Sequence, residues 1–470
     1  MSSHPRLNRA PTSAKPRRTN TRKAHALCAT LLMAVHGHAQ SDDWQWTGEI
    51  GYTGSWYTDE AAPFGPFGTA IHESGKMNRS AFSVDVKFDG QLQPDLSVHG
   101  WLTLEHDAKD AHALLLDHRS TEPVRELYVQ HTRGLWQLTA GKQRLDWGNS
   151  KGIRLLDRIN PTDWKNFNPD TLNYDSLGLW MLSAGYALSD AARLELVLSE
   201  QADGVVNSWD IDRPDGNRLD GGMRYSQLIG DASLAVSATL RHPASQRLQV
   251  VVPTIVSELE TSPDLGVSFT MPLPLVESDI NANLYVEALY QKDLPSAVVD
   301  LFKLAIGDLA GALTFEDADW FSHAVGTDLS LPGGTQLNLQ WVQYRNLDYV
   351  DQPSSSTYID PISGSEFTFD TSRYSIDWTT VSVGSPLVKA RQVKNHYSIA
   401  LSHTLAGIEL TDQFMYESGG GKWNYLGAQA NLAPQTRVSL AWHKYWGPQS
   451  THFGVLQADS SVQASLRHSF

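Results

Sequence analysis

From residue 44 to residue 470 the chain consists of strand-like segments in which apolar and polar residues alternate. Short turns and long polar loops take turns in connecting these segments. Such alternation gives each segment one apolar face and one polar face. Connections that alternate in length imply that the two ends of the strands meet different surroundings. A closed antiparallel barrel in a membrane, with lipid outside, water inside, short turns at one end and long loops at the other, has both properties.

The first segment shows the pattern most clearly. Its even positions carry Trp44, Trp46, Ile50, Tyr52 and Trp56, whereas its odd positions are mostly small or polar. Aromatic residues at both ends with smaller ones between them are typical of a lipid-facing strand that crosses two interfaces. Counting similar segments predicts an all-β, transmembrane antiparallel β-barrel of about 18 strands, in a range of about 16–18. The expected strands lie near 44–57, 82–88, 96–104, 123–132, 135–143, 180–186, 194–198, 218–228, 231–242, 264–272, 280–290, 320–330, 335–345, 399–401, 408–416, 426–432, 438–446 and 462–470.

The first 39 residues have the features of a secretory signal peptide. Basic residues without any acid precede a short apolar stretch at 27–35, and Gly37, His38 and Ala39 supply small residues near a cleavage site. The apolar stretch is far shorter than the roughly 20 residues of a spanning helix. We therefore expect cleavage near Ala39 and a single transmembrane barrel domain over residues 40–470.

Composition excludes several classes of protein. The net charge of −15, which becomes more negative once the basic leader is removed, argues against nucleic acid as a partner. The only cysteine, Cys28, lies in the leader, so disulfides, thiolate metal sites and a cysteine nucleophile are not expected. No later run of about 18 apolar residues predicts a spanning helix. The composition alone still allows a soluble secreted β-protein.

The chain ends on Phe470 at the end of an alternating segment. A terminal Phe of this kind resembles the signal by which outer-membrane proteins are recognised for barrel assembly, although His468 stands where a bulky apolar residue is usual. The expected location is therefore the outer membrane of a Gram-negative cell, with lipid and the barrel-assembly machinery as partners.

A charged signature follows the fifth expected strand. Gly141-Lys142-Gln143-Arg144-Leu145-Asp146-Trp147-Gly148 precedes Ile159-Asn160-Pro161-Thr162-Asp163. The pair resembles the "GRQ…WG…NP-x-D" signature of a poorly characterised family of proteobacterial outer-membrane barrels, with Lys142 in the place of the usual Arg. It is similar, more distantly, to 18-stranded export channels and substrate-selective porins, the alginate-export type among them. The resemblance implies a channel and leaves its substrate undefined.

We expect the loop at 144–176 to fold into the barrel and narrow it. Leu155, Leu156 and Ile159 can form one face of a short helix over residues 152–159 that ends before Pro161. The residues expected to line or brace a constriction are Lys142, Arg144, Arg154 and Arg158, opposed by Asp146, Asp157 and Asp163. The excess of positive charge would favour anionic solutes.

The same residues allow a purely structural interpretation. Arg144, Asp146 and Asp163 can pin the loop by ion pairs, while Trp147, Gly148, Asn160 and Pro161 fix its turns. The two interpretations are compatible, and the sequence leaves both open. The expected function is a channel, porin or export pore, for small or polymeric hydrophilic solutes.

Two other classes remain as alternatives. An outer-membrane enzyme of lipase or protease type would draw its groups from several strands, but the chain has no Gly-x-Ser-x-Gly or His-Glu-x-x-His motif. We expect no enzymatic activity, no metal site and no cofactor. A structural or adhesive barrel is the other alternative, because the loop at 346–394 is rich in Ser, Thr, Asp and aromatic residues. That loop could bind a surface partner or extend above the membrane as a hairpin, but we expect an ordinary solvated loop with local β-structure. Substrate, direction of transport and oligomeric state are not encoded in these patterns.

Overall fold

The computed structural model describes residues 44–59, 74–107, 123–150, 153–160, 176–200, 219–242, 247–251, 254–258, 261–273, 280–300, 313–349, 355–359, 363–370, 373–376 and 387–470. Residues Trp46–Phe470 form one compact unit, and the structure below is that of this unit. The expected signal peptide at residues 1–39 lies outside the described residues.

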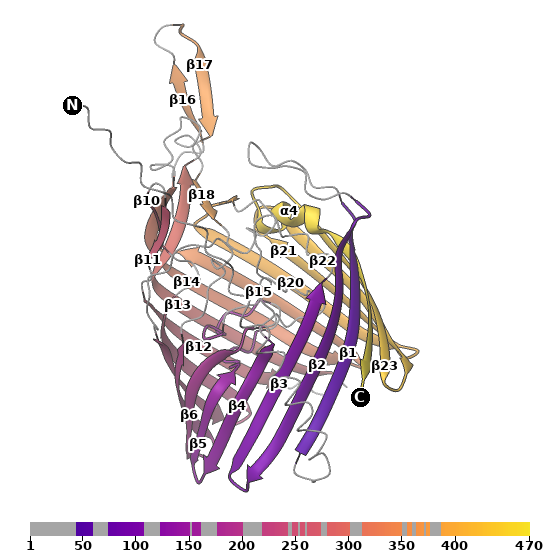
Figure 1. The fold of residues 1–470 in the computed structure, drawn as a ribbon. Coiled ribbons are helices and arrows are strands. Elements are labelled where there is room, and N and C mark those ends of the chain that lie inside the picture. The colour runs from indigo at the N-terminus through magenta and orange to yellow at the C-terminus, as the bar shows by residue number, and fades with distance from the viewer. Residues whose placement is uncertain are drawn as a thin grey trace, which may run out of the picture. The chain divides into compact units, whose positions relative to one another are not determined.

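Eighteen strands close into an antiparallel barrel, which confirms the expected fold class and strand number (Figure 1). The strands are β1 (Trp44–Tyr57), β2 (Met77–Gln93), β3 (Leu96–Asp107), β4 (Val124–Arg133), β5 (Trp136–Gln143), β6 (Leu179–Ser189), β7 (Ala192–Glu200), β8 (Leu219–Ile229), β9 (Ala232–Arg241), β12 (Ser262–Leu273), β13 (Asn281–Asp300), β14 (Leu313–Leu331), β15 (Thr335–Asn346), β20 (Val393–Leu405), β21 (Ile408–Glu417), β22 (Lys422–Ala433), β23 (Thr436–Trp446) and β24 (Ser461–Ser469).

The barrel closes where its first strand pairs with its last. Strands β1 and β24 run antiparallel with Glu49 opposite Ser469 and Tyr57 opposite Ser461. Beyond this register the backbone amides of Gly48 and Phe470 each donate to the other's carbonyl oxygen, at 3.0 and 2.9 Å. Closure leaves no unpaired edge between the first and last strands, which is the condition for spanning a bilayer with strands.

The two faces of each strand meet different surroundings. On β1 the large side chains of Ile50 and Tyr52 are exposed, and on β21–β23 Leu410, Leu426 and Leu440 are exposed in the same way. The alternate positions carry mostly polar or small side chains that are largely buried. We call the first face outward and the second inward. Side chains at the inward positions of a barrel this size line its interior.

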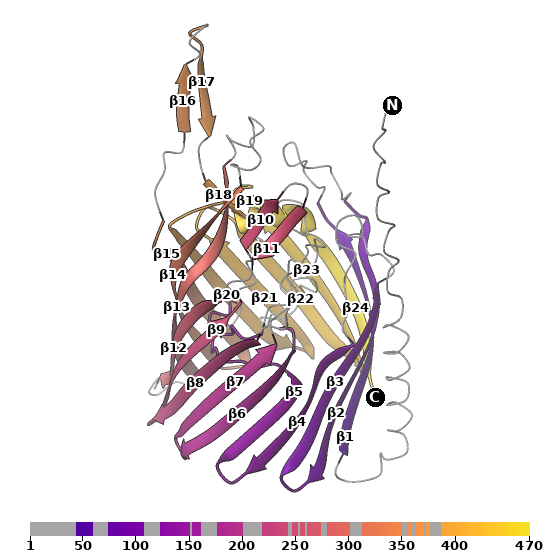
Figure 2. The same ribbon diagram turned by 60° about the vertical axis from the view of Figure 1, so that its left-hand side comes forward.

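The connections differ at the two ends of the barrel (Figures 1 and 2). Tight turns at one end use residues with positive φ, such as Gly134 at +60° and Ala406 at +51°. The other end carries additional elements: the hairpins β10 (Arg247–Val251) with β11 (Thr254–Glu258) and β16 (Ser355–Ile359) with β17 (Glu366–Asp370), the short strands β18 (Arg373–Ile376) and β19 (Leu387–Lys389), and the helices α4 (His452–Val455) and η4 (Leu456–Asp459).

The loop expected at 346–394 contains regular structure. Strands β16 and β17 pair from Ser355 opposite Asp370 to Ile359 opposite Glu366. Strand β18 continues the barrel sheet by pairing with the end of β13, with Val298 opposite Ser375. Among the residues described, none of the helices has the length and apolar character needed to cross a membrane.

Candidate functional site

The segment that follows β5 packs against inward-facing side chains of distant strands. The backbone N–H groups of Asn149 and Ser150 donate to Glu287 Oε1 on β13, the second at 2.9 Å, and the Ser150 hydroxyl donates to Glu287 Oε2 at 2.8 Å. On β15, the Gln340 amide nitrogen donates to the Ile153 carbonyl oxygen at 3.0 Å. Residues 144–150 and 153–160 are here called the β5–β6 segment. The segment is therefore hydrogen-bonded to β13 and β15, two strands that come much later in the chain.

Two carboxylates bind four consecutive backbone N–H groups of this segment. Asp157 Oδ1 accepts from Trp147 at 2.6 Å and from Gly148 at 2.7 Å, and Glu287 accepts from the next two residues. A Cβ on Gly148 would lie 3.3 Å from the Glu287 carboxylate and 3.4 Å from that of Asp157. Glycine at this position therefore gives the backbone close access to both acids.

The ionisation of Asp157 reflects its environment. Burial raises the pKa of the Asp157 carboxyl, and hydrogen bonds from Gly148 and the charge of Arg154 offset part of the rise. Arg154 Nη1 lies 3.0 Å from Asp146 Oδ1 and 3.3 Å from Asp157 Oδ2. The Asp146 side chain is 66% exposed, so this ion pair faces open space.

Arg158 lies beside a second arginine from the barrel wall. Its Nε is 3.7 Å from Asp264 Oδ2 on β12, and Arg241 Nε on β9 is 2.6 Å from the same oxygen. Burial and the neighbouring Arg241 lower the pKa of the Arg158 guanidinium to about 10, so it stays positively charged at neutral pH. Two guanidinium groups thus share one carboxylate.

Arg144 joins the segment to the wall formed by β3 and β4. Its Nε donates to Glu126, and its guanidinium carbon lies 4.6 Å from the centre of the Trp101 ring. The Lys87 ammonium lies 4.0 Å from the centre of the same ring. An inward-facing indole is therefore flanked by two cations, an arrangement that the ring's negative face stabilises.

Trp147 and Asn160 are the buried residues that connect the segment to β5, β6 and β7. The Asn160 amide nitrogen donates to the carbonyl oxygens of Gln143 and Leu177 at 3.1 and 2.7 Å, and its Oδ1 accepts from Leu145 at 2.8 Å. The Trp147 ring packs with Ile159 and inward side chains of β6 and β7.

The short helix expected at 152–159 is wrong: residues 153–160 form bends and irregular backbone. Leu155 and Leu156 pack with Leu289 on β13, whereas Ile159 packs with Trp147 in a separate cluster. The apolar residues therefore do not share one helix face. Side-chain acceptors replace helical hydrogen bonds, as when Leu155 N donates to Ser150 Oγ at 3.2 Å.

The expected site residues are brought together only in part. Arg154 contacts both Asp146 and Asp157, while Arg144 and Arg158 each pair with an acid of the wall. Lys142 is 5% exposed and lies in register between Leu127 and Trp180, on the face of β5 that also carries exposed Leu138. Pro161 and Asp163 lie outside the described residues.

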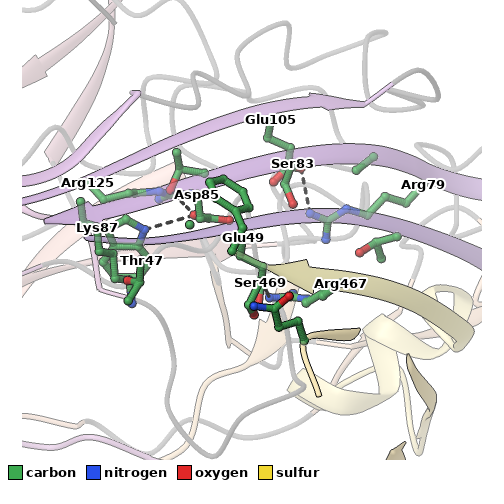
Figure 3. A pocket seen from close by; sticks show the side chains of 17 residues that line it. Thr47, Glu49, Arg79, Ser83, Asp85, Lys87, Glu105, Arg125, Arg467 and Ser469 are labelled. Atoms are coloured by element: carbon green, nitrogen blue, oxygen red, sulfur yellow. Dashed lines mark hydrogen bonds and ion pairs between the residues drawn. The ribbon is translucent and has the colours of Figure 1, made fainter. Parts of the chain in front are cut away.

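A cavity of about 670 Å³ lies along the inward faces of β1–β4 and β24 (Figure 3). It extends from Arg79, near the loop end of β2, to Gln435 in the turn between β22 and β23. Four cations and three carboxylates line it: Arg79, Lys87, Arg125 and Arg467 with Glu49, Asp85 and Glu105. Arg79 pairs with Glu105 at 2.8 Å and Arg467 with Glu49 at 3.0 Å.

A smaller cavity of about 200 Å³ continues along β4–β7 and is lined in part by Arg144, Leu145 and Trp147. The larger and the smaller cavity therefore lie on the same side of the barrel interior. Within the described ranges, no cluster of three or more His, Cys, Asp or Glu side chains is arranged to hold a metal ion.

Sequence reasoning missed the acids that hold the segment. Glu287, Asp264 and Glu126 all lie on strands, and each occupies an inward position. Glu287 alternates with the apolar positions Val286 and Ala288, so its strand parity marks it as an inward carboxylate. The same alternation assigns Lys142 and Gln143 to opposite faces of β5. Which group each buried acid binds depends on contacts across the barrel, and alternation does not predict those.

Comparison with protein-family models finds no match, and comparison with curated proteins finds none either. Among solved structures the chain is similar to OccAB3 of Acinetobacter baumannii, with a TM-score of 0.50 and 10% identity over 91% of this chain and 98% of that one. It is also similar to a BenF-like porin from Pseudomonas fluorescens Pf-5, with a TM-score of 0.50 and 9% identity over 91% of this chain and 97% of that one. Pseudomonas aeruginosa OccK8 (OprE) gives a TM-score of 0.50 and 7% identity over 91% and 98%. At these identities the likeness establishes the barrel fold, and the resemblance of residues 141–163 to a family signature stays a prediction.

Proposed function

We propose that this protein is an outer-membrane channel for small hydrophilic solutes. The observation that carries the proposal is a closed 18-stranded barrel with an apolar exposed outer face and a polar interior that contains a charged cavity of about 670 Å³. An exposed apolar belt requires lipid, and polar inward positions require water or polar partners. The likeness in fold to a BenF-like porin supports the same function.

We further propose that the β5–β6 segment narrows the lumen. The proposal rests on its hydrogen bonds to inward side chains of β13 and β15 and on its apolar contacts with β8 and β12. A Cβ on Gly222 of β8 would lie 2.9 Å from the Trp147 ring, and one on Gly266 of β12 would lie 2.8 Å from the Leu156 side chain. Inward glycines at these two positions give the segment room against the wall.

The charges support a modest preference for anions. Cations outnumber carboxylates by four to three in the larger cavity, and Arg158 and Arg241 share the single carboxylate of Asp264. Most of these cations are paired, so the field along the path is weak, and the preference expected is correspondingly small. Lys142 is buried and lines neither cavity, so it is left out of this count of cations.

The outward face and the last residue support location in an outer membrane. Exposed apolar side chains on successive strands supply the lipid contact, and Phe470, which is 61% exposed, directly follows the closing strand β24. We propose that Phe470 serves as the assembly signal after cleavage of a leader near Ala39.

Swelling of proteoliposomes tests the proposed function. Vesicles that contain the refolded protein should swell in isotonic solutions of small sugars, and the rate should fall steeply as solute size increases. Vesicles with the heat-denatured protein are the control. The enzyme and adhesin alternatives predict a sealed barrel, so absence of swelling with the folded protein would contradict the proposal.

A further inference from the structure

The inward face of β21–β23 carries an aromatic wall in place of the polar side chains usual in a water-filled lumen. Trp423, Tyr425 and Tyr445 are buried, together with Met415 on β21. The rings of Trp423 and Tyr445 stack with centroids 6.2 Å apart. Inward positions of a wet barrel are normally polar, so an apolar wall of this size requires a cover.

The connection between β23 and β24 supplies that cover. Phe453 of α4 is buried in the cluster, with its ring 6.5 Å from that of Trp423 and 6.4 Å from that of Tyr445. The Phe453 backbone N–H donates to Glu417 Oε1 on β21 at 2.8 Å. The connection, residues 447–460, is therefore fixed to the inward face of strands β21–β23.

The same connection is held by hydrogen bonds within itself near its start and is bonded to β23 at its end. The Thr451 hydroxyl donates to the Pro448 carbonyl oxygen at 2.6 Å and accepts from Gly454 N at 3.1 Å. At the other end the Tyr445 backbone N–H donates to the Ser460 hydroxyl oxygen at 3.1 Å. These side chains bind backbone N–H and C=O groups of the connection. Helical hydrogen bonds alone could not fix so short a connection.

The β5–β6 segment meets this cover. Ile153 packs against the aromatic cluster, and so does Leu456 of η4. Ile153 also packs against the cluster formed by Leu155, Leu156 and inward residues of β13–β15. The β5–β6 segment thus covers the inward face of β13–β15, and residues 447–460 cover that of β21–β23. Ile153 packs against both clusters. The two cavities lie on the opposite wall, along β24 and β1–β7.

We propose that residues 447–460 form a second element that narrows the lumen, and that together with the β5–β6 segment they confine solutes to a path along β24 and β1–β7. This inference rests on the proposed channel function. On this inference, solutes contact the side chains that line the larger cavity. They do not contact the inward side chains of β20–β23.

Accessibility of single cysteines to a charged methanethiosulfonate reagent tests the inference in planar bilayers. The only cysteine in the sequence, Cys28, lies in the expected leader, so each introduced thiol is unique. Ser83→Cys places a thiol in the larger cavity (Figure 3). Ser398→Cys on β20 is the matched variant, because Ser398 is 2% exposed and lies in register between Gln340, which binds Ile153, and Met415 of the aromatic wall.

The expected result is that the reagent lowers the open-channel current of Ser83→Cys by about half and leaves that of Ser398→Cys unchanged. Adding Phe453→Ala to Ser398→Cys should make the thiol reactive, because the cover loses its buried ring. Gln413→Cys, also 2% exposed on the inward face of β21, replaces Ser398→Cys if the latter fails to fold. Folding is checked by heat-modifiable migration on gels.

Each other outcome overturns the inference. Equal block of Ser83→Cys and Ser398→Cys would mean that the lumen is open on both walls, although the channel function would stand. No block at Ser83→Cys would mean that the path runs elsewhere. Absence of current from the folded unmodified protein would overturn the channel function, and this inference with it.

Discussion

The Glu287 carboxylate on β13 accepts hydrogen bonds from both the backbone N–H and the hydroxyl of Ser150, which lies 137 positions earlier in the chain. Glu287 is 0% exposed. Three donors offset part of the cost of burying this carboxylate, and the same donors would be costly to leave buried without an acceptor. This contact is therefore the main polar anchor of the β5–β6 segment on the barrel wall.

Replacing Glu287 by Ala should release the segment without unfolding the barrel. Three donors from Asn149 and Ser150 lose their acceptor, at about 1–3 kcal/mol each if they stay buried, which favours exposure of the segment to water. We expect larger and noisier single-channel conductance and faster amide exchange at residues 147–150. Glu409→Ala, on β21 at the turn end of the barrel, is the control and should behave as the unmodified protein.

Replacing Gly222 by Val should displace the same segment from the other side. The added Cβ would lie 2.9 Å from the Trp147 ring and 3.1 Å from Ile159 Cδ1, and overpacking of this kind costs about 1–3 kcal/mol. Trp147 fluorescence is masked by other tryptophans, so proteolysis of the 144–160 region is the measurement, with faster cleavage expected. At the neighbouring Gly221 a Cβ would meet only Val197 O at 3.4 Å, so Gly221→Val should leave cleavage unchanged.

Charge removal at Arg144 and Arg158 should shift ion selectivity. Replacing both by Gln leaves Glu126 without its guanidinium partner and Asp264 with Arg241 alone. The ratio of chloride to potassium permeability, from reversal potentials in a KCl gradient, should fall about twofold, the effect expected of single charges acting across water. Arg133→Gln, at the exposed last residue of β4, is the control. Unchanged selectivity in the double variant would refute the role of both arginines.

The buried Asp157 should make stability depend on pH in a defined direction. Its pKa is raised in the folded protein, so the folded state binds the proton more tightly than the unfolded state does. The free energy of unfolding contributed by this group therefore falls as pH rises from about 3.8 through the raised pKa. Because Oδ1 accepts both backbone N–H groups and Oδ2 faces Arg154, Asp157→Asn preserves the acceptor.

The measurement is the difference in melting temperature between Asp157→Asn and the unmodified protein at several pH values. The unmodified protein should lose stability relative to the variant as the pH rises above about 4. A difference that is constant with pH, or that grows in the opposite direction, would contradict the raised pKa.

The barrel was predictable because the two-residue alternation is a local property of each strand. Exposed Ile50 and Tyr52, and the inward charges Asp85 and Lys87, follow directly from that alternation. The shape of the β5–β6 segment was not predictable in the same way. Leu155, Leu156 and Ile159 have helical spacing, but distant acceptors such as Glu287 and two separate apolar clusters determine their conformation.

The second covering element was also beyond sequence reasoning. Trp423, Tyr425 and Tyr445 alternate like any strand positions, and nothing local indicates that Phe453 covers them from the inside. Glu417, which binds the Phe453 amide, is the last residue of β21, and its partner lies in a connection that follows two further strands. Such contacts depend on barrel closure and register, which a single sequence does not specify.

Single-channel recording in planar lipid bilayers tests the central claim most directly. The folded protein, without any addition, should insert in discrete steps of reproducible conductance, and heat-denatured protein should give none. We predict discrete conductance steps and a weak preference for chloride over potassium, because two inward connections narrow the lumen. Folded protein that inserts and gives a silent, sealed bilayer would contradict the channel function.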